Sequence, residues 1–491
     1  MVKKVDHKTF AMVILIIGVF MSALDNGIIA SALTSINYSF HVSEVQGTWG
    51  ITLYTLGMAI STPIIGKLAD KYGRRKLFLI EIAIFAVGSL LVALSPTFTL
   101  FLAARIIQSV GGGGIFIIAS SHVLSTYPKK AQGGLLGALG AVNGIASVVG
   151  PNLGSLILNT TGRWNWLFLI NLPIAIFVLI AGFIAIPETK GSHIKRLDLK
   201  GLIFLSLGIF AVMLAITNLQ SGHLLASLLT PQVWGILVLG ILSFGIFVML
   251  EKRVSEKTDP FLPYQLLKNQ GFLLTLTMGL LSGMLIAIFV FIPSFVEQRY
   301  GVSADNSGIW MSGIGLGSIV GAGVGGTLVS KLGAAKTVVV SGILSAIGFG
   351  AIGFFSPSTG WFLGASTLAG VGFGMLMGAP LSVLMAYFAG PKQNGVALGT
   401  LSVSRQVGLT IAPTIYATVI QNGFSRIPMK ESLEAYYRQL LQSTAQDQAG
   451  LLRIFYRTAQ AAYANLFVVA IVASLIIAVG GCYLKRRQVA A

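Results

Sequence analysis

Long apolar segments recur along the whole of this chain of 491 residues. Each is close to the ~20 residues that an α-helix needs to cross the hydrocarbon core of a bilayer. The composition agrees, because 55% of the residues are hydrophobic and only 10% are charged, far fewer charges than a soluble protein exposes. Since every backbone polar group inside a bilayer must be bonded internally, such segments fold as helices. The sequence therefore predicts an all-α polytopic membrane protein.

Fourteen membrane-spanning helices are expected from the apolar runs. The first run is too long for a signal-peptide core and no small-residue cleavage site follows it, so it is read as a retained span. The expected spans are 10–37, 46–66, 77–95, 98–122, 132–157, 166–187, 200–219, 232–250, 271–297, 307–330, 336–355, 361–388, 394–422 and 455–484.

Lysine and arginine gather in alternate loops and at both termini, as in 67–76 and 190–196. Cytoplasmic loops carry such an excess, so both termini are expected in the cytoplasm, with the protein in the plasma membrane of a bacterium. Segment 424–454 is then external although it carries four arginines and lysines. Its apolar residues from Leu433 to Leu441 follow helical spacing, which predicts an amphipathic helix. Whether this helix lies on the outer membrane face or covers an outward-facing cavity stays open.

Several classes of function are disfavoured. The net charge of +18 is spread over short loops, so we expect no nucleic-acid partner. The single cysteine, Cys482, cannot form an intrachain disulfide. We find no phosphate-binding loop, no nucleophile–base pair and no metal-ligand spacing, so an enzyme, a cofactor and a metal site are not expected. The protein is expected to act as a monomer.

An internal repeat divides the chain. Residues 66–76 (GKLADKYGRRK) match residues 326–336 (GTLVSKLGAAK) at Gly, Leu, Lys, Gly and Lys. This predicts an N-terminal six-helix bundle in 1–190, two inserted helices in 191–268 and a C-terminal six-helix bundle in 269–491. Paired halves that enclose a midplane cavity are typical of alternating-access transporters.

The stretch 66–76 resembles the loop motif of the major facilitator superfamily, G-x-L-a-D-r-x-G-r-[kr]. The resemblance implies the major facilitator fold and a conformational latch between the halves on the cytoplasmic side, in which Asp70 accepts hydrogen bonds from a helix N-terminus or a nearby arginine. The latch residues are Gly66, Asp70, Gly73, Arg74 and Arg75.

The stretch 144–157 (GIASVVGPNLGSLI) resembles the antiporter motif of this superfamily, with Gly144, Gly150, Pro151 and Gly154 in place and Ser155 where a second glycine is usual. The glycines permit close helix packing and the proline bends the span. In the superfamily this pattern accompanies export by antiport. Packing of small residues alone is the other reading.

Three further stretches resemble the fourteen-span drug:proton antiporters: 23–33 (ALDNGIIASAL), 163–176 (RWNWLFLINLPIAI) and 405–412 (RQVGLTIA). The sequence departs from that family at Asn165 and at Asn26-Gly27. We expect substrate preference to depart from the family at Asn26-Gly27.

Charged residues inside spans are costly and are functional hypotheses by default. Asp25 lies near the middle of the first span, where it can carry a proton or hold a packing contact. Arg105 resembles the arginine that the family ties to proton handling, and it either holds Asp25 ionised or extends to the interface. Glu81 is expected to pair with the basic loop. For Arg405 a helix-anchoring contact and an anionic ligand are both open.

A substrate cavity is expected between the halves. Flexible and aromatic side chains suit a cavity that accepts many shapes, although each residue taken alone more often packs or faces lipid. The candidates are Asn26, Tyr54, Gln108, Asn143, Met284, Phe289, Met375 and Met377.

These observations predict a proton-coupled multidrug efflux transporter of lipophilic or amphipathic small molecules that works by alternating access and confers drug resistance. With one deep carboxylate, a specialist for divalent cations is not expected. A dedicated exporter of one metabolite or lipid is the first alternative. A receptor or scaffold that transports nothing is the second, and it predicts that Asp25 and the span-5 motif are dispensable.

Overall fold

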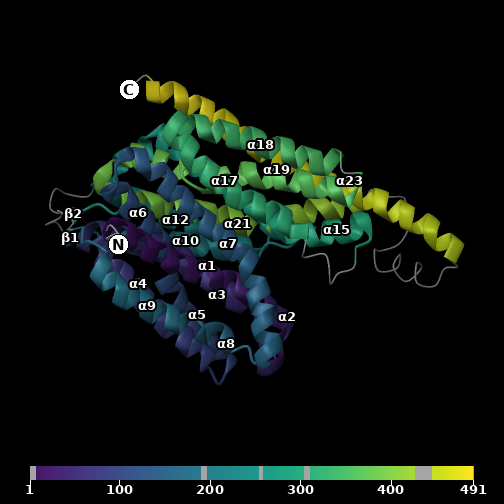
Figure 1. Cartoon of the computed structure of the whole chain (residues 1–491), viewed down its shortest axis with the longest axis horizontal. Coiled ribbons are helices and arrows are strands. Elements are labelled where there is room, and N and C mark those ends of the chain that lie inside the picture. Colours follow the sequence, from purple (N-terminus) through teal and green to yellow (C-terminus); the bar gives the residue numbers. More distant parts are fainter. Residues whose placement is uncertain are drawn as a thin grey trace, which may run out of the picture.

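A computed structural model describes residues 7–189, 196–253, 258–302, 310–355, 357–425 and 445–489 of the chain. These residues form helices and turns, apart from two short strands, β1 (Arg196–Leu197) and β2 (Thr258–Asp259), which pair in parallel. Figure 1 shows two groups of helices that lie side by side, one purple to blue and one green to yellow.

The first group contains the N-terminal helices. They are α1 (His7–Phe40), α2 (Glu44–Gly47), α3 (Trp49–Tyr72), α4 (Arg74–Ala93), α5 (Phe98–Gly113), α6 (Ile115–Thr126), α7 (Lys129–Thr161), α8 (Trp166–Leu169) and α9 (Asn171–Ala185). Three further helices follow, α10 (Leu199–Thr217), α11 (Leu224–Leu228) and α12 (Pro231–Arg253).

The second group contains the C-terminal helices. They are α13 (Tyr264–Lys268), α14 (Gln270–Ala287), the 3₁₀ turn η1 (Ile288–Phe291), α15 (Ile292–Tyr300), α17 (Met311–Leu332), α18 (Ala334–Phe354), α19 (Thr359–Met377), α20 (Pro380–Ala389), η3 (Pro391–Gln393), α21 (Asn394–Ser425) and α23 (Ala445–Val489).

Thirteen helical segments in the described part of the chain are long and apolar enough to cross a membrane. They correspond to thirteen of the fourteen predicted spans. The remaining one, 394–422, forms α21, which packs against α3 and α14 but is more polar than the others and is not among the thirteen. The helical membrane architecture is therefore confirmed, and the count of fourteen is not.

Some predicted spans are interrupted. The fourth divides at Gly114 into α5 and α6, after a run of four glycines that weakens the helix. The twelfth divides before Pro380, the first residue of α20, because proline cannot donate the backbone bond that would continue α19. Breaks of this kind are tolerated at membrane depth only where the freed backbone groups are buried in protein or line a cavity.

The repeated motif forms the same turn in both groups. Gly73 joins α3 to α4 with φ of 107°, and Gly333 joins α17 to α18 with φ of 86°. Side chains rarely adopt this conformation, so both copies of the motif keep glycine. We call the end of the molecule that carries these turns the motif end.

The two groups touch most extensively along two helix pairs, α7 with α17 and α3 with α21. In α7 and α17, a Cβ atom on Gly137 would lie 2.7 Å from the Ala322 carbonyl oxygen. In α3 and α21, a Cβ atom on Gly399 would lie 2.7 Å from the Cα of Pro63. Helices in lipid associate mainly through van der Waals packing, which small residues allow by bringing the backbones together.

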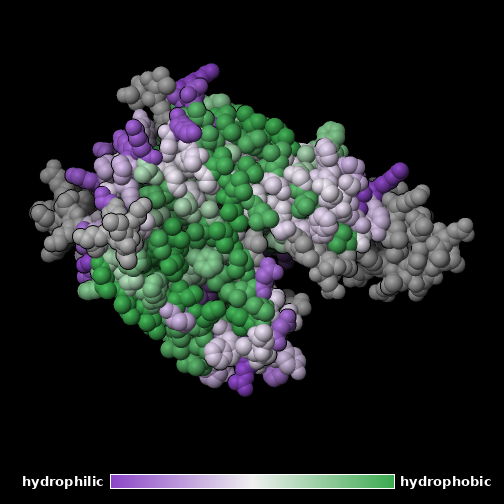
Figure 2. All heavy atoms as spheres, in the orientation of Figure 1, coloured by the Kyte–Doolittle hydropathy of each residue, from purple (hydrophilic) through white to green (hydrophobic). Residues whose placement is uncertain are grey.

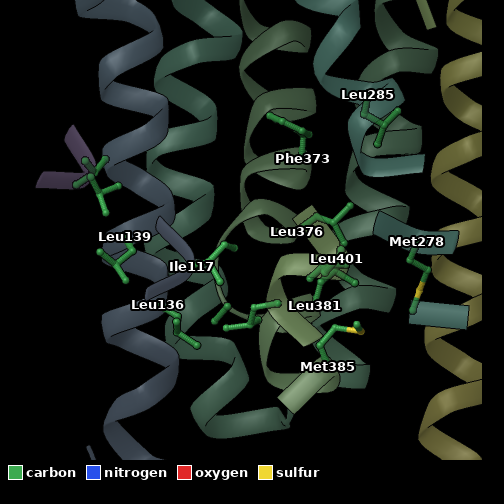
Figure 3. Close-up of a cluster of buried hydrophobic side chains, with 14 of the residues drawn as sticks. Ile117, Leu136, Leu139, Met278, Leu285, Phe373, Leu376, Leu381, Met385 and Leu401 are labelled. Carbon is green, nitrogen blue, oxygen red and sulfur yellow. The ribbon is translucent and has the colours of Figure 1, made fainter. Parts of the chain in front are cut away.

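A shared apolar core joins the groups at this depth. Figure 3 shows side chains of α6 and α7 gathered beside side chains of α14, α19, α20 and α21. All of them are nearly excluded from solvent: Ile117, Leu136, Leu139, Met278, Leu285, Phe373, Leu376, Leu381, Met385 and Leu401. Figure 2 shows a broad hydrophobic band across the visible face, and the surface is indented between the two groups at the end opposite the motif turns.

The segment 424–454 is only partly described. α21 ends at Ser425 and α23 begins at Ala445, about ten residues before the predicted start of the last span. The amphipathic helix predicted from Leu433 to Leu441 lies outside the described residues.

Substituting Gly283 with leucine should destabilise the fold, because a Cβ atom there would collide with the Arg405 carbonyl oxygen and separate α14 from α21. Overpacking of this kind costs about 1–3 kcal/mol. We expect Gly283→Leu to lower the thermal unfolding temperature in detergent. Gly323→Leu is the matched control, since a Cβ atom there meets open space. Equal stabilities would contradict the packing of α14 on α21.

Candidate functional site

Asp25 and Arg105 form a buried ion pair. Asp25 lies on α1 and Arg105 on α5, and the Nη1 atom of the arginine donates to Oδ2 of the aspartate over 2.7 Å. Their side chains are 1% and 0% exposed. The contact excludes the alternative in which Arg105 extends to the membrane interface. Removing one partner of such a pair leaves an uncompensated charge, which typically costs 3–5 kcal/mol.

Gln108 completes the contact on α5, one turn after Arg105. Its Oε1 accepts from Arg105 Nη1 at 2.6 Å, and its Nε2 donates to Asp25 Oδ1 at 2.8 Å. The helical spacing of three residues places both side chains on one face toward α1. Gln108 therefore holds both partners at fixed positions.

Two polar residues from other helices join the carboxylate. Asn171, the first residue of α9, donates to Asp25 Oδ1 at 3.3 Å and to Ser89 Oγ on α4 at 3.3 Å. Ser89 also accepts from Gln108 Nε2 at 2.8 Å. The carboxylate thus receives hydrogen bonds from α5 and α9, which satisfies a buried charge that would otherwise be costly.

The guanidinium group of Arg105 lies between two aromatic rings. Its Cζ is 4.0 Å from the centroid of Tyr54 on α3 and 5.6 Å from that of Phe168 on α8. The Nε atom donates to the Gly50 carbonyl at 3.3 Å, and Nη2 has no partner among the described residues. Cation–π contacts of this kind stabilise a desolvated cation by about 2 kcal/mol or more.

Sequence reasoning found Asp25, Arg105, Gln108 and Tyr54 but missed Ser89, Asn171 and Phe168. Asn171 carried a usable signal, because it is a polar residue inside the apolar stretch 163–176. Ser89 and Phe168 carried none, since a single serine or phenylalanine is ordinary in a span. Their proximity to Asp25 depends on how α4, α8 and α9 pack.

The expected pairing of Glu81 with the basic loop was wrong. Glu81 is fully buried on α4, and its Oε2 accepts from the backbone N–H of Gly114 at 3.0 Å. Oε1 has no partner among the described residues. The break between α5 and α6 leaves an N–H at the start of α6 without a helical acceptor, and the carboxylate supplies one.

A second site joins the groups at the motif end. Oδ2 of Asp70 accepts from the backbone N–H groups of Gly395 at 2.7 Å and Val396 at 3.2 Å, and its Oδ1 lies 2.7 Å from Arg74 Nη2. Gly395 and Val396 begin α21, so the carboxylate also lies at the positive end of that helix. Both kinds of partner that the motif predicted for Asp70 are present.

The other motif residues arrange this contact. Gly66 lies so close to Gly395 that a Cβ atom would strike its carbonyl oxygen. Arg74 Nε donates to Ser121 Oγ on α6 at 2.6 Å. Arg75 points elsewhere, with Nε 3.8 Å from Glu188 Oε2 and its guanidinium over the Phe183 ring. We call Asp70, Arg74, Gly395 and Val396 the closing contact.

The glycines of the antiporter motif face two different helices. A Cβ atom on Gly144 would lie 3.1 Å from Ser318 Oγ on α17. A Cβ atom on Gly150 would lie 2.8 Å from the Cα of Gly27 on α1, and one on Gly27 would lie 3.2 Å from Pro151 Cδ. Within the motif, α7 therefore contacts α17 of the second group at Gly144 and α1 of the first group at Gly150. Gly154 is buried on the same helix.

The predicted cavity residues separate into different surroundings. Tyr54 and Gln108 join Asp25 and Arg105, as described above. Four others lie on helices of the second group: Phe289 is against Phe373 with centroids 5.8 Å apart, Met375 is 4% exposed, and Met284 and Met377 pack against the apolar core that both groups share. Asn143 is partly buried on α7, and the side chain of Asn26 lies outside the described part of the structure.

The described residues contain no cluster of three or more His, Cys, Asp or Glu side chains that could hold a metal ion. The deep site, as we call Asp25, Arg105 and the side chains that surround them, consists of an ion pair, two amides, a serine and two aromatic rings.

Asp70→Asn should open the motif end more often, because the amide is a weaker acceptor for two N–H groups and loses the ion pair with Arg74. Hydrogen bonds to a charged group contribute about 1.5–3 kcal/mol, which shifts the closed-to-open ratio about ten-fold or more. The test uses Val396→Cys, at a buried position, in a Cys482→Ser background, with the rate of maleimide labelling as readout.

We expect faster labelling of that cysteine when Asp70→Asn is added. Glu297→Gln, an exposed carboxyl-to-amide change on α15, is the matched control. Equal labelling rates with and without Asp70→Asn would show that the closing contact does not hold the groups together.

Comparisons with known proteins agree with this architecture. A family model described as the Major Facilitator Superfamily matches residues 15–413. The chain is 55% identical over 412 residues to an uncharacterized MFS-type transporter, YfiU, of Bacillus subtilis (strain 168), covering 84% of this chain and 79% of the relative. It is 30% identical over 423 residues to Multidrug resistance protein 3 of the same organism, covering 85% and 80%.

Solved structures show the same fold. The human organic anion transporter MFSD10 (TETRAN) superposes with a TM-score of 0.61 at 16% identity, covering 95% of this chain and 99% of that one. The proton:xylose symporter XylE superposes with a TM-score of 0.59 at 14% identity, covering 95% and 94%. The chain belongs to the Major Facilitator Superfamily, and is a multi-pass secondary transporter of small molecules rather than an enzyme.

Proposed function

We propose that this transporter is a proton-coupled antiporter that exports lipophilic or amphipathic compounds across the plasma membrane by alternating access. The observation that carries the proposal is the ion pair between Asp25 and Arg105, buried within membrane-spanning helices. A carboxylate at this depth is costly and is therefore a candidate for a function, and proton binding is the chemistry that suits it.

Protonation would change the deep site as a whole. A proton taken up from solution adds to the Asp25 carboxylate and forms a neutral carboxylic acid, while Arg105 keeps its positive charge. The site then changes from neutral to a single positive charge. Arg105 retains Gln108 Oε1, the Gly50 carbonyl and the Tyr54 ring as partners. The attraction between α1 and α5 weakens, so their positions can change.

The helix contacts offer a route from this site to the interface. α1 meets α7 at Gly27 and Gly150, and α7 meets α17 at Gly137 and Ala322. A movement of α1 therefore bears on the helix that touches the second group. Alternating access also needs a contact that is made in one state and broken in the other. We propose that the closing contact at Asp70, which joins the two groups at the motif end, is that contact.

The arrangement of the chain supports the same reading. We propose that 1–190 and 269–491 act as two bundles that rock against each other, with 191–268 inserted between them. α10, which lies in 191–268, packs on both α3 and α21, where Ile209 and Met213 contact Leu56. We propose that the motif end and both termini lie in the cytoplasm, which the excess of lysine and arginine in the motif-end loops supports.

Named relatives support export of several compounds rather than one. Multidrug resistance protein 3 and the multidrug transporter MdtP of Bacillus subtilis (strain 168) are 30% and 29% identical to this chain, each match covering 85% of it. A substrate list confined to one compound would favour a dedicated exporter instead.

Asp25→Asn should abolish proton coupling. In proteoliposomes with an imposed pH gradient, we expect the wild type to move rhodamine 123 or fluorescein against its concentration gradient, and Asp25→Asn to lose the stimulation by the gradient. Dye exchange without a pH gradient should persist in the variant, because Arg105 keeps Gln108, the Gly50 carbonyl and the Tyr54 ring as partners.

Glu297→Gln serves as the matched control and should retain gradient-driven transport. If Asp25→Asn pumped either dye as fast as the wild type under the same gradient, Asp25 would not carry the coupling proton. If the wild type moved no dye in any condition, the export function itself would be wrong.

A further inference from the structure

A second arginine, Arg405, lies inside a long helix of the second group, on a different helix from the ion pair of the first group. Arg405 is on α21, about three turns after the helix begins. The carbonyl oxygen of Arg405 touches Gly283 of α14, so the two helices are in contact at this depth.

Its position on α21 directs the side chain toward the interior of the molecule. Leu398 and Tyr416 lie seven residues before and eleven residues after Arg405, spacings that keep the three on one face of a helix. Leu398 is 2% exposed and Tyr416 is 0% exposed and donates to the Met284 carbonyl on α14. The side chain of Arg405 therefore lies on the face of α21 that packs in the interior of the second group, beside Ser282 of α14. Arg405 is nevertheless partly exposed.

The charge of Arg405 is uncompensated within the described part of the chain. Its one hydrogen bond there runs from Nε to Ser282 Oγ at 3.3 Å, and Ser282 in turn donates to the Gly279 carbonyl. The ion pairs among the described residues join other arginines, such as Arg105 with Asp25. Glu81, the other deep carboxylate, is bonded to Gly114.

A hydroxyl group is a weak substitute for a counter-ion. A guanidinium group keeps its charge at all ordinary pH values and offers five N–H donors in a planar fork. Buried or membrane-embedded charges are stable only with a partner of opposite charge or in a hydrated cavity. The fork fits a carboxylate, sulfonate or phosphate oxygen pair, which accepts two parallel hydrogen bonds.

We propose that Arg405 is the binding site for an anionic group of transported compounds, so that the substrates include amphipathic acids with an apolar body and one carboxylate, sulfonate or phosphate. The proposal rests on the export function proposed above and specifies its substrate class. Ser282 orients the guanidinium group through its hydrogen bond to Nε.

The test compares two xanthene dyes of opposite charge, fluorescein and rhodamine 123, in proteoliposomes with an imposed pH gradient. For Arg405→Gln we expect the KM for fluorescein to rise about 10- to 100-fold, because the hydrogen bonds to a charged group are lost. The KM for rhodamine 123 should not rise. Arg405→Lys keeps the charge but not the fork and should give an intermediate KM for fluorescein.

Arg457→Gln is the matched control, because Arg457 is an exposed arginine on α23. Equal rises in KM for both dyes in Arg405→Gln, or an unchanged KM for fluorescein, would overturn the anion site while leaving export intact. If the wild type transported neither dye, the proposed function would be overturned instead. Thermal unfolding temperatures of the variants distinguish a lost binding contact from a misfolded protein.

Discussion

The ion pair between Asp25 and Arg105 is the constraint around which the first group of helices is arranged. Neither charge is stable alone at this depth, and each must also have its remaining hydrogen-bonding groups satisfied. Gln108, Asn171 and the ring of Tyr54 meet that need from α5, α9 and α3. The polar interior of this group is thus a single network that ties several helices to one carboxylate. A change in the charge of that carboxylate acts on all of them together.

The two copies of the repeated motif close the motif end with different chemistry. The first copy of the motif holds Asp70, and the second holds Ser330, whose hydroxyl donates to the Lys130 carbonyl on α7. The first copy thus closes the motif end with a carboxylate at a helix N-terminus, and the second with a neutral hydrogen bond. Both contacts cross between the groups. The deep arginines of the two groups also differ. Arg105 in the first group is paired with Asp25, whereas Arg405 in the second group is hydrogen-bonded to Ser282.

Several site residues could be predicted because their chemistry is unusual where they stand. A charge inside an apolar run, as at Asp25 and Arg105, is visible in the sequence, and so is the spacing that puts Gln108 on the face of Arg105. The partner of Glu81 could not be predicted in this way. Its carboxylate bonds to a backbone N–H that is free only because the fourth span breaks at Gly114, and the position of the break relative to α4 is set by packing. The contacts of Asp70 could be expected because the motif implies two kinds of partner, a helix N-terminus and a nearby arginine, and both are present.

The sequence by itself determined that this chain crosses the membrane many times, that the motif of residues 66–76 recurs at 326–336 and that one carboxylate and one arginine lie inside the early apolar segments. Hydrophobic length, the repeat and buried charge are properties of single segments, so no tertiary information is needed to recognise them. The tertiary structure decided which helices supply Ser89 and Asn171 to the deep site, and which end of the molecule is closed. Those facts depend on how close helices far apart in the chain approach, and glycine contacts such as Gly27 with Gly150 set that distance only after the helices pack.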